Sequence, residues 1–235
     1  VGQITYFSGF CMKDLIPKYT QILLRAGNGE TEEMAFEAEV AESVISTIME
    51  HNEVADWQGD TASANVYINR YDGLIKIIDA ATTAVDGNTS SATAITSGAS
   101  GNVDTLISDM ANARPAKVKS AANQVLFVGQ DTFDKYVDTL NAKNLYHVNA
   151  TEWANYTVSI PGKNVTLVGV VGLDGTNRMF LGTQENFFLG FDLQNDEEEF
   201  DMWYDKKDDK VYYRVKFKRG LQVAYPDEIV EFTLA

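Results

Sequence analysis

The chain has 235 residues, 34 of them acidic and 19 basic, which gives a net charge of −15 at pH 7. Surfaces that bind nucleic acid or anionic lipid need clustered Lys and Arg, so this balance argues against both functions. The single cysteine, Cys11, cannot form an intrachain disulfide, and a reducing compartment is expected. No run of 18 or more apolar residues occurs, so no transmembrane helix is predicted.

The chain opens on an extended segment. Ile4 and Tyr6 alternate within a strand predicted over Val1–Phe10, and an irregular piece with Pro17 follows up to residue 25. Because the strand pattern is already under way at Val1, without a methionine, we expect a further segment to precede it in the gene.

A long acidic helix is predicted next. Apolar residues recur at helical spacing from about residue 31 to 54, and Thr31 can cap the start. No Lys or Arg occurs from Ala26 to Asn69, whereas ten acidic residues do: Glu30, Glu32, Glu33, Glu37, Glu39, Glu42, Glu50, Glu53, Asp56 and Asp60. This run is either a solvated face of the helix or a surface that awaits a basic partner segment.

The middle of the chain alternates turns, helices and one strand. Gly59 suits the turn that ends the long helix, and Asp72-Gly73 opens a short apolar helix. Residues 82–101 are rich in Thr, Ser, Ala and Gly and predict a loop with one strand near Thr93–Thr96. A helix over 102–113, a strand over 124–128 and a helix capped by Asp131 are predicted to follow.

After residue 150 the pattern changes to strands. Apolar residues form a strand over Val165–Val171, alternate from Phe187 to Leu193, and form a last strand over Ile229–Thr233. Between them lies a hairpin with its loop at residues 205–210. The predicted register places Trp203 opposite Tyr212, Asp201 opposite Arg214, Glu199 opposite Lys216, and Glu197 opposite Lys218. Opposite charges then face each other across the strands, and all apolar residues share the other face.

No pattern typical of catalysis or metal binding is present. The two histidines, His51 and His147, lie in no H-E-x-x-H or Cys/His arrangement, and no phosphate-binding loop or nucleophile elbow occurs. The acidic loop at 205–209 lacks the glycine and closing glutamate of an EF-hand. The sequence therefore predicts no catalytic residue, no cofactor and no metal, and the chain is expected not to be an enzyme.

Three short motifs carry a resemblance to a known family. These are W-Q-G-D at 57–60, Y-D-G-L at 71–74, and E-N-F-F-L-G-F-D-L at 185–193, ahead of the charged hairpin. In their order and spacing along the chain they resemble the major capsid proteins of tailed bacteriophages with the Hong Kong 97 type fold. Among these, the chain looks most similar to capsid proteins from phages of Bacteroidetes hosts, including crAss-like phages.

The resemblance implies an α+β fold with a spine helix at 31–54, a peripheral domain and an axial domain. Residues 1–25 would be the returning arm of an extended loop, 26–100 the peripheral domain, 101–218 mostly the axial domain, and 219–235 a strand returning to the peripheral domain. The family has an N-terminal arm and a full extended loop before this point, and by the resemblance both would lie ahead of Val1.

The implied function is self-assembly into an icosahedral shell around double-stranded DNA. The partners would be other copies of the chain, as hexamers and pentamers, with portal and auxiliary or decoration proteins, and neither sequence-specific DNA binding nor membrane contact is expected. The location would be the virion capsid, assembled in the bacterial cytoplasm. The predicted inter-subunit contacts are five glutamates of the long helix: Glu32, Glu33, Glu37, Glu39 and Glu42. The alternatives are a secreted or surface adhesin-like β-rich binding module and an encapsulin-type compartment shell.

Overall fold

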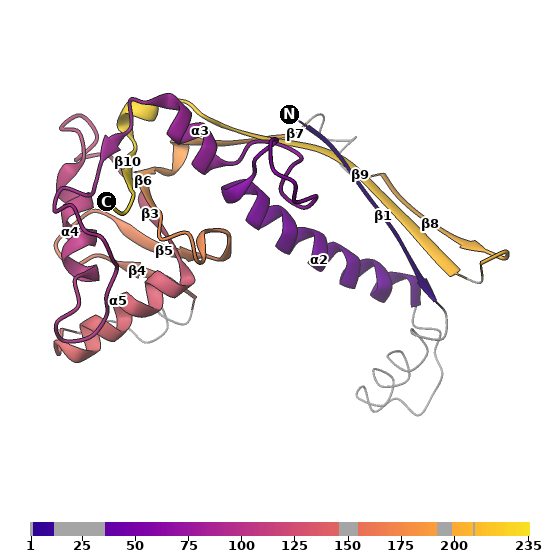
Figure 1. Cartoon of the computed structure of the whole chain (residues 1–235), viewed down its shortest axis with the longest axis horizontal. Helices are drawn as coiled ribbons and strands as arrows, with labels where there is room; N and C mark the ends of the chain where they lie inside the picture. Colours follow the sequence, from indigo (N-terminus) through magenta and orange to yellow (C-terminus); the bar gives the residue numbers. More distant parts are fainter. Residues whose placement is uncertain (1, 12–35, 146–154, 192–198, 209) are drawn as a thin grey trace. The chain divides into compact units, whose positions relative to one another are not determined.

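The computed structural model describes residues 2–11, 36–145, 155–191, 199–208 and 210–235 (Figure 1). The chain divides into two compact units. Unit 1 comprises residues 1–52 and 190–220, and unit 2 comprises 53–189 and 221–235. Three elements run from one unit into the other: α2 (Phe36–Gln58), β7 (Phe187–Phe191) and β9 (Lys210–Val223).

Unit 1 is built on an antiparallel sheet in which β9 is central. Strand β1 (Gly2–Cys11) pairs with β9 over its whole length, β8 (Glu199–Asp205) pairs with β9 from its other side, and β7 is the remaining neighbour. The hairpin register predicted from charge and aromatic pairing is confirmed. Trp203 lies opposite Tyr212, Asp201 opposite Arg214, and Glu199 opposite Lys216; Glu197 lies outside the described residues.

Helix α2 packs on one face of this sheet. Val44 and Ile48, four residues apart, are buried against Val215 of β9, and partly buried side chains of β1, β8 and β9 surround them. The helix ends at Gln58, four residues later than predicted. The extension has a physical reason, because Ala55 and Trp57 are buried and Trp57 packs in the core of unit 2. Its predicted start, at residues 31–35, lies outside the described residues.

Unit 2 contains a mixed sheet that has six strands within the described residues, in the order β2-β10-β6-β3-β5-β4. The strand ranges are β2 (Val85–Asp86), β3 (Gln124–Gly129), β4 (Thr157–Ser159), β5 (Thr166–Val170), β6 (Met179–Thr183) and β10 (Val230–Phe232). The pairs β3–β5 and β10–β2 are parallel, and the others are antiparallel. Short 3-10 turns occur at Val171–Leu173, Gln184–Asn186 and Pro226–Glu228.

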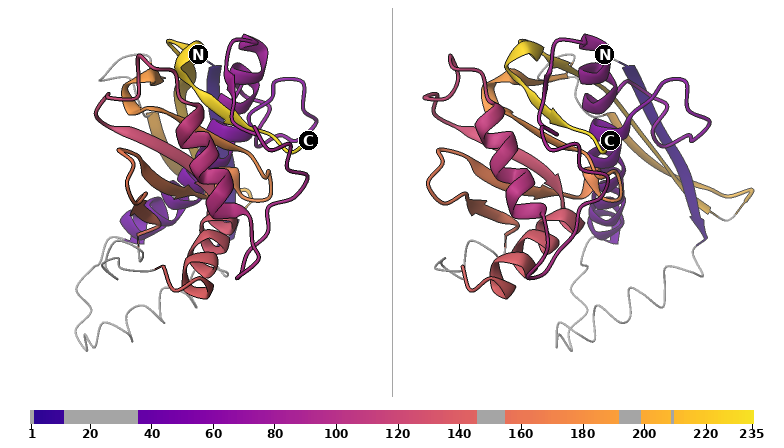
Figure 2. Two further views of the ribbon diagram at one scale, coloured as in Figure 1. Left: turned by 90° about the vertical axis from the view of Figure 1, so that its left-hand side faces the viewer. Right: turned by 60° about the vertical axis from the view of Figure 1, so that its left-hand side comes forward.

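Each face of this sheet is covered by a different set of helical residues. Helices α4 (Val103–Ala113) and α5 (Gln130–Ala142) cover one face (Figure 2). Leu126 of β3 is fully buried on that face. Phe127 points to the opposite face, toward α3 (Leu74–Ala81) and the buried end of α2. Alternation along a strand buried on both faces explains why β3 is almost continuously apolar.

Two local predictions were wrong. Thr93–Thr96 forms no strand; the backbone and hydroxyl of Thr96 instead bond the Asn102 side chain, which holds the segment as a loop. Asp131 does not cap α5, because Gly129 occupies the N-cap position and Asp131 lies in the first turn, where its carboxylate accepts a bond from the Thr132 amide. At Thr96 a side chain thus competes with regular backbone pairing.

Candidate inter-subunit surfaces

Of the five glutamates predicted as contacts, the structure describes the side chain of one, Glu42. Glu42 lies on α2 and its side chain is exposed. Glu37 and Glu39 lie near the described start of α2, but their side chains are outside the described part of the structure. Glu32 and Glu33 lie outside the described residues. A contact role for these glutamates therefore stays a prediction.

The exposed side of α2 in unit 1 is both acidic and apolar. Glu42 and Glu50 are exposed, and so are Ile45 and Met49, whose side chain is 65% accessible. Residues four apart on a helix are neighbours, so Ile45 and Met49 form a short apolar strip beside the acidic groups. Such an arrangement suits a partner that presents apolar side chains together with cations.

A stack of aromatic rings lies on the face of the unit 1 sheet that points away from α2. The rings of Phe7 and Tyr212 are 5.5 Å apart and nearly parallel, and the ring of Trp203 lies about 6 Å from both. Phe7 is 59% exposed and Trp203 40%. Arg214 extends over Trp203 and forms an ion pair of 2.5 Å with Asp201. Sequence reasoning placed Trp203 opposite Tyr212 but missed Phe7, since nothing local links β1 to the hairpin.

The two glycine motifs of the sequence meet in unit 2. The amide of Gly73 donates to the carbonyl oxygen of Gly59 at 2.8 Å, and the amide of Gly59 donates to Ala55 at the end of α2. A Cβ atom on Gly59 would lie 2.4 Å from the Ala55 oxygen and 2.5 Å from the Tyr71 oxygen. Only glycine permits this approach, so the paired segments 57–60 and 71–74 are called the glycine clasp below.

Polar contacts fasten the glycine clasp from outside. The ammonium group of Lys76 lies 2.7 Å from carboxylate oxygens of both Asp60 and Asp72. The Thr61 backbone and hydroxyl also donate to Asp72, at 3.0 and 2.8 Å. The hydrogen bond from Lys76, followed by those from Thr61, lowers the pKa of Asp72 from 3.8 to about 2.

Acid should loosen the glycine clasp through Asp72. Because the pKa of this carboxyl is lower in the folded chain than in the unfolded chain, its contribution is complete well above pH 3.8 and is lost as the pH falls toward about 2. The group is exposed, so we expect a loss of about 1 kcal/mol or less. Urea unfolding of wild type and Asp72→Asn at pH 6 and pH 2.5 should show a smaller acid loss for the variant. Asp134→Asn, an exposed site on α5, is the control and should retain the wild-type loss; equal losses in all three proteins would contradict the assignment.

Trp57 anchors the glycine clasp to the sheet of unit 2. Its side chain is 6% exposed and lies between Phe127 and Phe180, with ring centres 5.2 and 5.9 Å away. Next to it, the Gln58 amide donates to the carbonyl oxygen of Gly172 at 2.8 Å. The W-Q-G-D motif therefore joins the end of α2 to the sheet by packing and by a hydrogen bond.

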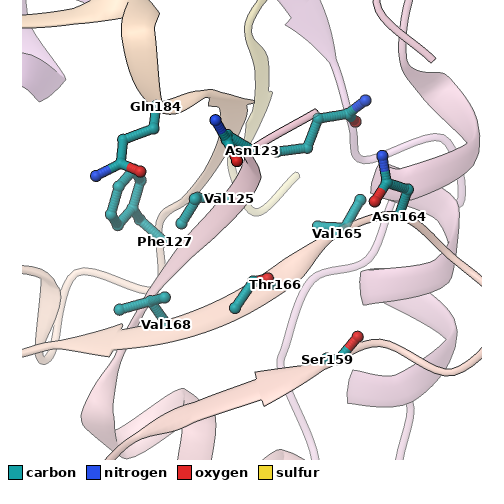
Figure 3. Close-up of a pocket in the computed structure, with 10 residues that line it drawn as sticks. Asn123, Val125, Phe127, Ser159, Asn164, Val165, Thr166, Val168 and Gln184 are labelled. Carbon is teal, nitrogen blue, oxygen red and sulfur yellow. The ribbon is translucent and has the colours of Figure 1, made fainter. Parts of the chain in front are cut away.

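A pocket of about 480 Å³ lies beside strands β3 and β5 of the unit 2 sheet (Figure 3). Its lining contains amides and hydroxyls together with a few apolar side chains: Asn123, Gln124, Val125, Phe127, Ser159, Asn164, Val165, Thr166, Val168 and Gln184. None of these lining residues is ionisable near neutral pH, so the pocket offers no general acid or base.

The described residues contain neither a metal-binding cluster nor a membrane-spanning helix. Within them, no cluster of three or more His, Cys, Asp or Glu side chains could hold a metal ion. None of the described helices is long and apolar enough to cross a bilayer.

Known proteins resemble this chain in structure rather than in sequence. No family model and no curated protein sequence matches it. Of the solved structures, a chain of the satellite phage P4 procapsid that includes the size determination (Sid) protein superposes with a TM-score of 0.65 at 15% identity, over 99% of this chain and 70% of that one. The capsid of an empty GTA particle gives 0.61 at 9% identity, over 100% and 74%. The holo-SrpI encapsulin complex from Synechococcus elongatus PCC 7942 gives 0.50 at 10% identity, over 99% and 73%.

These similarities confirm the predicted fold class. The chain has the mixed helix-and-sheet fold of phage major capsid proteins of the Hong Kong 97 type. The resemblance that the short motifs gave from sequence therefore holds for the fold over nearly the whole chain.

Proposed function

We propose that this chain is the major capsid protein of a tailed bacteriophage and that copies of it assemble into the icosahedral shell around double-stranded DNA. The observation that carries the proposal is the fold match over 99% of the chain to a phage procapsid chain. At 15% identity this match establishes the fold, and the function follows by analogy with that protein. In this role the chain is a structural protein and not an enzyme.

We infer the domain roles from the same analogy. The spine helix α2 and the sheet of unit 1 belong to the peripheral domain, and the sheet of unit 2 with α4 and α5 belongs to the axial domain. We therefore propose the peripheral domain for the hairpin at 199–218, which the sequence resemblance assigned to the axial domain; its pairing with β1 in unit 1 supports this. Copies of the chain form hexamers and pentamers, with portal and decoration proteins as further partners.

The narrower parts of the proposal rest on the sequence resemblance alone. These are a host among the Bacteroidetes, a crAss-like phage and assembly in the host cytoplasm, and the order of the three motifs at 57–60, 71–74 and 185–193 supports them. Recovering the genomic neighbourhood of the gene would test them, because tail, portal and terminase genes of such a phage should lie beside it.

Charge reversal on α2 tests the predicted contact surface. We expect that replacing Glu37, Glu39 and Glu42 together with Lys lowers the yield of assembled particles at least tenfold, because the face, now basic, would repel a basic partner surface. Sedimentation of the full-length protein measures the assembled fraction. The control replaces Asp134 and Asp138, exposed on α5, with Lys. Equal assembly by both variants would contradict a contact role for the glutamates.

An encapsulin-type compartment is the second candidate, since an encapsulin complex shares the fold. The contents of the particles distinguish the two functions. Particles recovered from the natural source should contain double-stranded DNA if the chain is a phage capsid protein, and a protein cargo if it is a compartment shell. A stable monomer with affinity for glycans would support the adhesin-like alternative and contradict both shell functions.

A further inference from the structure

A positive charge is buried beside the pocket of unit 2 that Figure 3 shows. Arg114 is only 7% exposed. Its guanidinium donates to the carbonyl oxygen of Ala111 and to the side-chain oxygen of Gln124, which lines the pocket. No carboxylate of the described residues forms an ion pair with it. An arginine buried this deeply is normally paired with an anion, so its charge remains available to an occupant of the pocket.

Two lysines lie next to residues of the same pocket. Lys163 directly precedes Asn164 of the lining, and the carbonyl oxygen of Lys119 accepts a hydrogen bond from the Gln124 amide at 3.3 Å. Within the described part of the chain, neither lysine is ion-paired, whereas the neighbouring Lys117 is. Together with the buried guanidinium they make this end of the sheet basic, on a chain whose net charge is −15.

The pocket itself contains no acidic group and leaves apolar side chains partly open. Its lining has neither Asp nor Glu. Val125 and Phe127 of β3 pair in register with Thr166 and Val168 of β5, so the four side chains share one face of the sheet, and all four are only partly buried. The pocket therefore suits a partner that combines carboxylates with apolar side chains.

Helix α2 presents this combination on its exposed side. Glu42, Ile45 and Met49 recur at the spacing of one helix face, and Glu50 adjoins Met49. At a rise of about 1.5 Å per residue, the two glutamates lie about 12 Å apart along the helix, with the two apolar side chains between them. The helix contains no Lys or Arg that could neutralise these glutamates. The α2 surface of one copy is thus complementary in charge and in apolar character to the pocket of another.

We propose that in the assembled shell the exposed side of α2 from one copy docks on the pocket of a second copy. Ile45 and Met49 lie against the apolar side chains of β3 and β5. The two glutamates of α2 face Lys119 and Lys163. The inference rests on the proposed shell function, because it names two surfaces that join shell subunits. The contact is heterologous, since two different surfaces meet, so it can repeat from copy to copy around a ring.

An exchange of charge between the two surfaces tests this docking. Replacing Lys119 and Lys163 of the full-length protein with Glu should lower the yield of sedimenting particles by about tenfold or more, because like charges would then meet. Adding Glu42→Lys and Glu50→Lys to the same chain should restore the yield to within about threefold of wild type, because opposite charges face each other again.

The matched control reverses two cations elsewhere on the surface, Lys135 on α5 and Lys207 in the hairpin loop, and should lower the yield less than about threefold. Circular dichroism checks that each variant folds. Normal assembly of the folded Lys119/Lys163 variant would overturn the proposal. A loss that the α2 substitutions do not restore would also overturn it, because the pocket would then have another occupant, such as DNA phosphate or a different protein. If wild type forms no shells, the proposed function fails instead.

A cross-link tests the contact itself. In a Cys11→Ser background, Ser46→Cys, on the exposed side of α2, and Ser159→Cys, in the pocket lining, are placed in separate chains that are mixed and assembled. A short thiol-reactive cross-linker should join the two chains into dimers within the shells. Ser46→Cys mixed with Asp134→Cys, an exposed position on α5, is the control and should give no dimers. Intact mixed shells without the expected dimers would refute the docking.

Discussion

Replacing Gly73 with alanine should destabilise the protein by about 3 kcal/mol, near the upper end of what overpacking a well-packed site costs. The added Cβ would lie 2.5 Å from the backbone nitrogen of Gly59 and 2.6 Å from the carbonyl oxygen of Trp57. Both atoms belong to the backbone, so they cannot rotate away as the end of a side chain could. The segments of the glycine clasp would have to separate, and the 2.8 Å bond between Gly73 and Gly59 would be lost with them.

The free energy of unfolding, measured by urea titration, gives the size of this effect. Gly162→Ala is the matched control, because its Cβ would meet nothing within 4 Å and only the left-handed backbone, with φ of +72°, opposes it. We expect the control to lose about 1–2 kcal/mol. If Gly73→Ala proved no worse than this control, the close approach within the glycine clasp would be disproved.

Replacing Trp57 with alanine should cost about 3–5 kcal/mol, the range found when a large buried aromatic residue is removed from a core. The indole fills the space between Phe127 and Phe180 on the face of the unit 2 sheet opposite α4 and α5. It also lies directly over Gly172, whose added Cβ would be 2.3 Å from the ring. The surrounding backbone is held by the sheet and can collapse into the cavity only in part.

Trp203→Ala provides the comparison within the same chain. Trp203 is 40% exposed and stacks on Phe7 and Tyr212 at the surface of unit 1, so its loss should cost about 1 kcal/mol. Thermal and urea unfolding of both variants give the two values. Equal costs would contradict the assignment of Trp57 as the anchor of the glycine clasp.

The sequence predicted the helices and the hairpin, because their patterns lie within short stretches of the chain. It did not predict contacts between residues far apart in the sequence. The hairpin register followed from alternation and charge within about twenty residues, and it was confirmed pair by pair for Asp201 and Trp203. The helices at 103–113 and 130–142 followed from apolar spacing. The strand predicted at Thr93–Thr96 does not form, because the Thr96 amide donates to the side-chain oxygen of Asn102. β-propensity does not take such a side-chain bond into account.

Contacts between segments far apart in the chain could not be predicted from the sequence. The motifs 57–60 and 71–74 carried the resemblance to capsid proteins, but their spacing does not predict that Gly59 and Gly73 are in contact. Phe7 was one apolar residue in a strand until the sheet placed it against Tyr212, more than 200 positions along the chain. Contacts between distant segments depend on the assembled topology, and a single sequence records them only where charges or patterns must match.

Electron cryomicroscopy of the expressed full-length protein tests the central claim most directly. The account predicts closed shells or capsomer sheets with fivefold and sixfold units, into whose density the fold described above fits. A strictly monomeric protein at all concentrations, with no shells, rings or sheets on the grid, would contradict the claim that this chain is a shell-forming subunit.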